Sequence, residues 1–180
     1  LVGVAVKIFS SAVQTIKEFE QSTANLAAIF GVSVDSIQPL IDQAKKLGET
    51  TQFTASQVLE LQGALAKLGF TSLEIQAATG DVLNLAAALD LELGRAADVF
   101  AIASSKSAVN AEFLAEALKT SGAAANASGV PLEKVASLIG TIANSGIDAS
   151  TAGTSLKNIF IELGNKGLTL DQALSKIGNS

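Results

Sequence analysis

Apolar residues recur every three or four positions along most of the chain, which is the spacing of one buried face of an α-helix. The first such run extends from residue 4 to residue 30, with charged and amide side chains at the positions between. We therefore assign residues 1–30 to one long amphipathic helix that continues a segment upstream. Its apolar stripe comprises Ile8, Ala12, Ile16, Phe19, Thr23, Leu26 and Phe30.

Further runs with the same period fill residues 31–180, which we expect to form one compact helical domain. The pattern predicts an all-α fold, an irregular multi-helix bundle of about eight or nine helices. The positions expected to face inward include Leu40, Ile41 and Ala44, then Val58, Leu61, Leu65 and Leu68, then Ile75, Val82 and Leu85, then Ala96, Val99 and Phe100, then Leu114 and Leu118, then Val135 and Ile139, and lastly Leu156, Ile159, Phe160 and Leu163.

A recurrent corner separates several of these helices, in which a glycine is followed by an apolar residue and then by a polar residue that can cap a helix. Glycine just past a helix end adopts the left-handed conformation without a steric penalty. The corner occurs at Gly31, Gly69, Gly129, Gly146 and Gly167. The unequal intervals between these glycines exclude a solenoid of identical repeats.

The clearest example lies in residues 47–76, where two capping boxes follow each other. Thr54 with Gln57, and Thr71 with Glu74, have the spacing at which each side chain bonds a free backbone donor of the first turn. The chain is expected to run through a polar turn after Gly48, before the first box. We expect a helix, a sharp corner and a second helix.

Gly69, followed by Phe70, is the predicted pivot of that corner, with Phe70 packing back on the preceding turn. A Gly69→Val substitution is expected to destabilise the fold by about 1–3 kcal/mol, through the positive φ and through overpacking.

Other helix ends are marked by single residues. Pro39 fits only the first turn of a helix that begins near Asp35 or Ser36. Asp90 is a candidate cap for the helix after it. Pro131 suits a first helical position, with Glu133 placed two residues later where the helix dipole favours a carboxylate.

Within the helix expected after Gly146, Gly153 provides a small face against which a second helix can cross closely, and Thr154 lies near the start of that helix. A polar stretch, Ser104–Asn110, is expected to separate the two helices before Gly129.

The composition is poor in charge, with 48% hydrophobic and 16% charged residues, against about 25% charged in an average soluble domain. Either other copies or partners cover much of the surface, or an Ala-rich bundle is kept soluble by Ser, Thr, Asn and Gln. The net charge of −5 repels phosphate, so a sequence-specific nucleic-acid partner is not expected. The absence of Cys fits a reducing cytoplasm.

The side chains give little support for catalysis, because the chain has neither His nor Cys. Glu112 and Glu116 share a helix face and could hold a cation, although a solvated acidic face is the favoured interpretation. The segment Gly153–Lys157 lacks the glycine spacing of a phosphate loop. We expect no enzyme activity, no catalytic or metal-binding residue and no cofactor.

Several short segments, in order over residues from about Phe19 to Leu163, together resemble the conserved region of phage tail tape measure proteins. Lys67-Leu68 depart from the family's small residues, and Pro131 stands where the family tends to have Ser or Thr. The matching segments are Phe19-Glu20, residues 47–55, residues 65–71 with Glu74, Leu85-Ala86, residues 129–133, Gly146-Ile147 and residues 152–157. The motif positions, with a structural role implied for each, are Gly48, Phe53, Thr54, Gly69, Phe70, Thr71, Gly129, Gly146, Gly153 and Thr154.

This resemblance implies a structural virion protein that occupies the tail tube, sets tail length during assembly and leaves ahead of the genome at ejection. The implied partners are other copies of the chain, tail tube, tail tip or baseplate hub proteins, and tail assembly chaperones. The implied location is the virion tail, after assembly in the host bacterial cytoplasm.

Folded helices change length little with residue number, so we expect this segment to anchor or pack rather than to measure. A membrane-active helical module that assists DNA entry, in contact with the host envelope on ejection, is the alternative. The apolar start Leu1–Val6 supports it. A lytic enzyme is the third class, disfavoured by the missing His and Cys.

Overall fold

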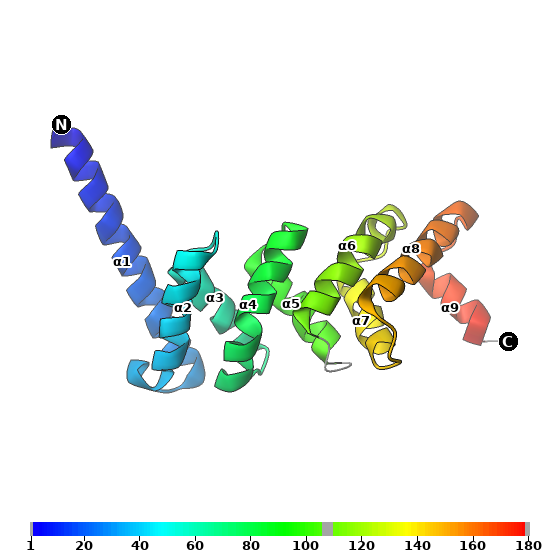
Figure 1. Cartoon of the computed structure of the whole chain (residues 1–180), viewed down its shortest axis with the longest axis horizontal. Helices are drawn as coiled ribbons and strands as arrows, with labels where there is room; N and C mark the ends of the chain where they lie inside the picture. The colour runs from blue at the N-terminus through cyan, green and yellow to red at the C-terminus, as the bar shows by residue number, and fades with distance from the viewer. Residues whose placement is uncertain (1, 106–109, 179–180) are drawn as a thin grey trace. The chain divides into compact units, whose positions relative to one another are not determined.

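The computed structural model of the chain describes residues 2–105 and 110–178, and the described residues form helices and connecting turns without a strand (Figure 1). The predicted all-α class is confirmed. Contacts group the chain into two compact units, Leu1–Leu83 and Asn84–Ser180. The predicted single domain over residues 31–180 spans both units and stays a prediction. Of the predicted polar stretch Ser104–Asn110, residues 106–109 lie outside the described residues.

The first unit is built around a short central helix that contacts two others. Helix α3 packs against both α1 and α2, and the 3₁₀ turn η1 touches the same two helices. The core contains Leu26, Ile37, Leu40, Ile41, Ala44, Val58, Leu61, Leu65, Ile75 and Val82. The elements are α1 (Val2–Phe30), η1 (Val34–Ile37), α2 (Gln38–Thr50), α3 (Ala55–Lys67) and α4 (Ser72–Leu89), the last of which contains the unit boundary.

Helix α1 is as long as predicted, but only its C-terminal part is buried. Thr23, Leu26 and Ala27 are buried, whereas Ala12 is exposed and Ile16 is 57% exposed. The predicted apolar stripe is therefore present but is not buried at Ala12 and Ile16, and the side chain of Ile8 lies outside the described ones. The 29 residues of α1 extend about 44 Å and the 13 of α3 only about 20 Å, so α1 projects beyond its partner (Figure 1).

A buried amide chain joins three elements of this unit. Gln62 is fully buried, and its Nε2 donates to the Leu40 carbonyl at 3.3 Å and to Oε1 of Gln43 at 3.1 Å. Gln43 in turn donates to the carbonyl of Gln76 at 2.7 Å. Because buried polar groups are costly without partners, these bonds fix how α2, α3 and the start of α4 meet.

After the end of α4, the described residues of the second unit form four helices packed in alternating pairs and a short terminal helix. Helix α6 makes its most extensive contacts with α8, and α5 packs against α7, with α6 also touching α7. The core contains Ala96, Val99, Phe100, Leu114, Ala117, Leu118, Val135, Ile139, Ala152, Leu156 and Phe160. The helices are α5 (Leu93–Ser104), α6 (Ala111–Ala127), α7 (Leu132–Ala143), α8 (Ala149–Lys166) and α9 (Leu170–Gly178).

Two residues predicted to face inward do not. Leu68 is 44% exposed because it is the C-cap of α3 and follows the last full turn. Ile159 is 48% exposed on α8, where Leu156, Phe160 and Leu163 already complete the buried stripe. With 3.6 residues per turn, a residue at the edge of a buried stripe can face either the core or solvent. Ile159 lies at that edge and faces solvent.

The predicted start of α5 is corrected. Asp90 does not cap α5, whose N-cap is Glu92 without a side-chain bond. Asp90 instead has φ +52°, and the N–H of Leu91 donates to the carbonyl of Ala86 at 2.9 Å, so Asp90 closes α4 as a glycine usually would.

The two proline positions also differ by a few residues from expectation. Pro39 does lie in the first turn of α2, but that helix begins at Gln38 after η1 rather than near Asp35 or Ser36. Pro131 is the N-cap of α7, one position before the first helical residue. Both fit the rule that the missing proline N–H is harmless at a helix start.

Candidate functional site

The five predicted corners share one backbone geometry, the left-handed one that favours glycine. Gly31, Gly69, Gly129, Gly146 and Gly167 have φ between +61° and +94°. Four of the five are followed by an N–H that donates to the carbonyl five residues earlier in the chain, as for Val130 to Ala125 at 2.8 Å. These glycines terminate helices, as the pattern predicts.

At Gly69 the termination is a Schellman motif. The Gly69 N–H donates to the carbonyl of Ala66 at 3.0 Å, and the Phe70 N–H donates to that of Leu65 at 3.2 Å. Phe70 is half-buried. An added Cβ at Gly69 would meet no atom within 4 Å, so the positive φ is the main penalty that the structure gives for Gly69→Val.

Both predicted capping boxes are formed. The Thr54 N–H donates to Oε1 of Gln57 at 2.8 Å, and the Gln57 N–H donates back to the Thr54 hydroxyl at 3.2 Å. Thr71 and Glu74 exchange the same bonds, at 2.8 and 3.4 Å. Donation from the Thr71 N–H and hydroxyl lowers the pKa of Glu74.

A third capping box, which was not predicted, is formed by Thr169 and Gln172. The Thr169 N–H donates to Oε1 of Gln172 at 2.9 Å, and the Gln172 N–H donates to the Thr169 hydroxyl at 3.2 Å. The Thr-x-x-Gln spacing directly after Gly167 is the same signature as at Thr54. The corner and the cap therefore recur together.

Carboxylates stabilise the starts of α7 and α8. Asp148 Oδ1 accepts the Thr151 N–H at 2.9 Å, and that bond lowers the pKa of Asp148. The pKa of Glu133 is also lowered, chiefly by its own backbone N–H and further by Arg95, whose Nε lies 3.0 Å from the carboxylate. Both groups lie where the helix dipole favours a negative charge.

The other motif residues of the first unit lie near the α2–α3 connection. Gly48 is inside α2, which continues to Thr50, so the polar turn predicted after Gly48 begins two residues later. A Cβ on Gly48 would come within 2.6 Å of the backbone nitrogen of Ala55, so the first turn of α3 needs a glycine there. Phe53 is half-buried in the connection, with its N–H donating to the Thr51 hydroxyl at 3.2 Å.

Gly153 lies where α8 crosses α6, as predicted. Its Cβ would lie 2.9 Å from both the Ala117 carbonyl oxygen and Cβ of Thr120. Thr154, the next motif position, is exposed. A second such crossing, at Gly140, was missed: a Cβ there would come within 2.5 Å of the carbonyl oxygen of Ala103. The spacing of apolar residues does not distinguish Gly140 from glycines that have free space around them.

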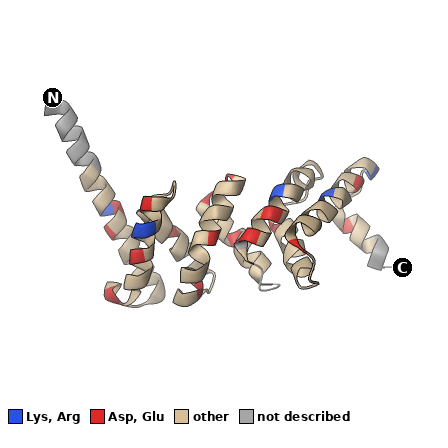
Figure 2. Ribbon diagram, viewed as in Figure 1, with Lys and Arg blue, Asp and Glu red and all other residues tan. Residues whose placement is uncertain are grey.

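The surface charges are sparse and do not converge on a chemical centre. Figure 2 shows charged residues at few positions on ribbons that are otherwise uncharged. Glu112 and Glu116 are both exposed on α6. Among the described residues there is no group of three or more His, Asp or Glu side chains arranged to hold a metal ion.

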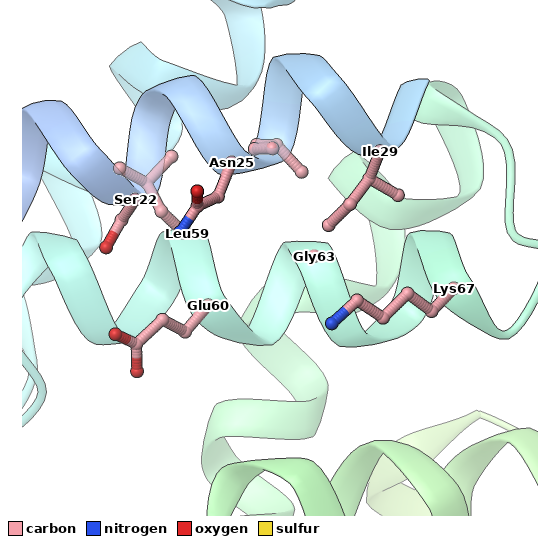
Figure 3. Close-up of a pocket in the computed structure, with 8 residues that line it drawn as sticks. Ser22, Asn25, Ile29, Leu59, Glu60, Gly63 and Lys67 are labelled. Atoms are coloured by element: carbon pink, nitrogen blue, oxygen red, sulfur yellow. The ribbon is translucent and has the colours of Figure 1, made fainter. Parts of the chain in front are cut away.

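A half-open hollow of about 160 Å³ lies along the seam between α1 and α3 (Figure 3). An adjoining hollow of about 340 Å³ is lined by Gln14, Lys17, Glu18 and Gln21. Ile29 covers Gly63, whose Cβ would lie 3.2 Å from Ile29 Cδ1. The lining carries one acidic and one basic side chain, and it does not combine a nucleophile with a general base. The lining residues are Ser22, Asn25, Leu26, Ile29, Leu59, Glu60, Gly63 and Lys67.

Within the described ranges, none of the helices is by itself long and apolar enough to cross a bilayer. The segments Ala12–Phe30 and Val34–Thr50 satisfy that measure only when taken as a pair, and they meet at a bend of 92°.

A family model described as phage-related minor tail protein matches residues 41–101 and 90–180. The chain belongs to this family. Membership confirms the resemblance found in the motif segments, and it places the chain among phage tail proteins.

Two curated relatives match this chain over most of its length. It is 29% identical over 192 residues to the tape measure protein of Pneumococcus phage Dp-1, covering 95% of the chain and 17% of the relative. It is 29% identical over 169 residues to the probable tape measure protein of Escherichia phage P2, covering 81% of the chain and 21% of the relative. The chain thus spans about a fifth of the length of these relatives. No solved structure matches it.

Proposed function

We propose that this chain is a structural, non-catalytic segment of a tape measure protein in a phage tail or tail-like particle. The whole protein would determine tail length, take part in tail assembly and accompany genome ejection. Its place would be the virion tail, after assembly in the bacterial cytoplasm. The observation that supports this most directly is the alignment of 95% of the chain with 17% of a tape measure protein.

Within that protein we assign the segment an anchoring role at the tail tip or in the tube. As one unbroken helix, 180 residues would extend about 270 Å, and each residue would add about 1.5 Å of length. Here α1, with 29 residues, is the longest helix of the described ranges, and the glycine corners fold the following helices back within each unit. Extended helices elsewhere in the protein would supply the measured length.

The proposed partners are other copies of the chain, tail tube proteins, tail tip or baseplate hub proteins, and assembly chaperones. Exposed apolar side chains such as Leu73, which is 78% exposed, offer surface for such contacts. The net charge of −5 disfavours retention of the genome in the same channel.

Two deletions of equal length test the anchoring role. Removal of the 18 residues of α8 is expected to abolish or reduce the number of tails, because α8 carries the main contact surface of α6. Removal of 18 residues from an extended helical region outside this chain is expected to shorten each tail by about 27 Å, the length of the helix removed. Tail lengths are measured by electron microscopy. Tails that shorten in proportion to the number of residues removed with α8 would overturn the proposal.

A membrane-active module is the second candidate, favoured by the bent pair of apolar segments at α1 and α2. Against it, the apolar residues Leu26, Ile37 and Leu40 of that pair are already buried in the first unit. Dye-filled vesicles distinguish the two: the folded chain is expected to cause no leakage, and leakage at micromolar protein would favour the membrane role.

A further inference from the structure

The two hollows at the seam between α1 and α3 form one elongated groove, because they share Ser22, Asn25 and Glu60 as lining residues. The groove extends along α1 from Gln14 to Ile29, which is about 22 Å of helix. The hollow of 160 Å³ is smaller than the roughly 300–1,000 Å³ of sites that hold a cofactor or a drug-sized molecule. The groove therefore has the length for an elongated partner and, in this hollow, the depth for one side chain.

A hydroxyl in the middle of the groove has no hydrogen-bond partner. Ser22 is only 7% exposed, and among the described residues its hydroxyl forms no hydrogen bond. Figure 3 shows this hydroxyl pointing from α1 toward α3, at the same end of the hollow as the Glu60 carboxylate. The neighbouring Asn25 is already engaged, because its Oδ1 accepts a bond from Gln21 at 2.9 Å. A hydroxyl oxygen and a carboxylate side by side suit an ammonium or guanidinium group, which supplies several donors and a positive charge.

Opposite charges flank the hollow along α3. Glu60 lies at one end, and Lys67, seven residues later, reaches back from the other end (Figure 3). Seven residues correspond to about 10 Å along a helix axis. Within the described residues, neither of these two charges takes part in an ion pair. The walls between them are apolar and include Leu26, Leu59 and Ile29, of which Ile29 is 36% exposed.

We propose that this groove is the docking site of an amphipathic helix from another protein. Its basic side chain would lie at Ser22 and Glu60, its acidic side chain at Lys67, and a leucine-sized apolar side chain would enter the hollow between them. Residues seven apart lie on one face of a helix, so a single helix provides all three contacts. An extended peptide fits less well, because the backbone of α1 and α3 is bonded within its own helices and leaves the peptide backbone without partners.

The described helices of a second copy do not carry this pattern. Opposite charges seven residues apart on one described helix occur as Glu60 with Lys67 on α3 and as Glu112 with Lys119 on α6. In both pairs, the residues three and four positions after the acidic one are glycine, alanine or glutamate. Neither pair has a leucine-sized side chain between its charges, so the partner is a different protein. The inference rests on the proposed function only for the expectation that this protein is another component of the tail.

Synthetic peptides test the charge pattern. Each is an alanine-rich helix of 15 residues with a central Leu, flanked seven residues apart by Lys and Glu, by two Lys or by two Glu, and each carries a fluorophore. In fluorescence anisotropy, the native chain is expected to bind the Lys/Glu peptide at least threefold more tightly than the other two. This order does not depend on the direction in which the peptide lies. Equal affinities, or no saturable binding up to about 1 mM peptide, overturn the proposal.

Charge reversals in the chain are expected to change the preferred peptide. Glu60→Lys should bind the peptide with two Glu most tightly, and Lys67→Glu the peptide with two Lys, each by at least threefold. Glu112→Lys and Lys119→Glu are matched controls, because they reverse exposed charges with the same spacing on α6, which does not line the groove. Both controls should keep the native order, and circular dichroism checks that all four variants are folded. Control variants that change preference in the same way overturn the site.

The apolar and hydroxyl contacts are tested separately. Replacement of the central Leu of the Lys/Glu peptide by Ala is expected to weaken binding by about tenfold. Ser22→Ala is expected to weaken binding of the Leu-containing peptide by about threefold without lowering the urea midpoint, because the hydroxyl has no partner in the free chain. An unchanged affinity in the first case removes the apolar contact, and in the second it removes Ser22 from the site.

The docking site and the proposed function fail separately. A chain that binds none of the peptides has no such site, but the alignment with tape measure proteins and the deletion experiment are unaffected. Proportional shortening after the α8 deletion removes the anchoring role but leaves the peptide affinities in place.

Discussion

Glycines at helix crossings determine how closely the helices of the second unit approach. At Gly153 a Cβ would lie 2.9 Å from the Ala117 carbonyl oxygen, which belongs to the backbone and cannot rotate away. Gly122 lies inside the partner helix α6, but a Cβ there would meet only Leu132 Cδ1 at 3.9 Å, an ordinary contact. Two glycines of one helix pair thus have opposite consequences for substitution.

Gly153→Ala is expected to lower the free energy of unfolding by about 1–3 kcal/mol, because α6 and α8 must separate. The matched control, Gly122→Ala, is expected to raise it by about 0.5–1 kcal/mol, since alanine loses less backbone entropy in a helix. Urea unfolding followed by circular dichroism measures both. Equal shifts in the two variants would contradict close packing at Gly153.

Gly69 differs, because its constraint lies in the backbone alone. Gly69→Val is expected to destabilise the chain by about 1–2 kcal/mol through the positive φ, without a packing contribution. Gly69→Asn is expected to cost about half as much, since Asn enters the left-handed region more readily. Thermal unfolding of both variants checks the order, and a valine variant as stable as the native chain would remove Gly69 as the pivot.

At the scale of the element, α8 begins at a carboxylate whose charge supports the helix. The lowered pKa of Asp148 means that the folded chain releases this proton at a lower pH than the unfolded chain does. The contribution to stability is therefore present above the ordinary carboxyl pKa of about 4 and is lost as the pH falls through the lowered value.

Asp148→Asn tests this contribution, because the amide oxygen can still accept the Thr151 N–H but does not titrate. Between pH 6 and pH 3, the urea midpoint of the native chain is expected to fall more steeply than that of D148N. The two variants should converge at the acidic end. Parallel curves across the whole range would mean that the charge of Asp148 contributes nothing.

Element ends can be predicted from the sequence where one residue type has one physical reason. The positive-φ glycines and the Thr54 and Thr71 boxes depend only on local backbone geometry, which neighbouring residues specify. A feature that depends on a partner helix cannot be predicted in this way: Gly140 resembles any helical glycine until α5 is placed against it. Asp90 was misassigned because Asp serves both at helix starts and, less often, in the left-handed conformation.

The same distinction explains the misplaced core positions. Ile16 has the spacing of a buried residue, and only the length of α3 reveals that its unit does not reach it. The motif residues of the candidate site were predicted, because their order along the chain resembles that of the family. The hollow between α1 and α3 was not predicted, because it depends on how the two helices pack against each other.

At the scale of the whole molecule, the net charge of −5 predicts weak interaction with nucleic acid. The chain is expected to show no binding to a random duplex at 50 mM salt and micromolar protein in fluorescence anisotropy. A variant in which exposed acidic residues of α6, Glu112 and Glu116, become Lys should shift the balance toward binding. Tight, salt-sensitive binding by the native chain would contradict a segment that lets the genome pass.

The pairing of each helix with its near neighbours has a consequence for the order of events during synthesis. The contacts of α3 with α1 and α2 close loops of only a few tens of residues, so folding is expected to be fast for the size of the chain. All of these partners have left the ribosome before most of Asn84–Ser180 has been translated. At about 5–20 residues per second, the first unit has several seconds to fold while the second is still being made.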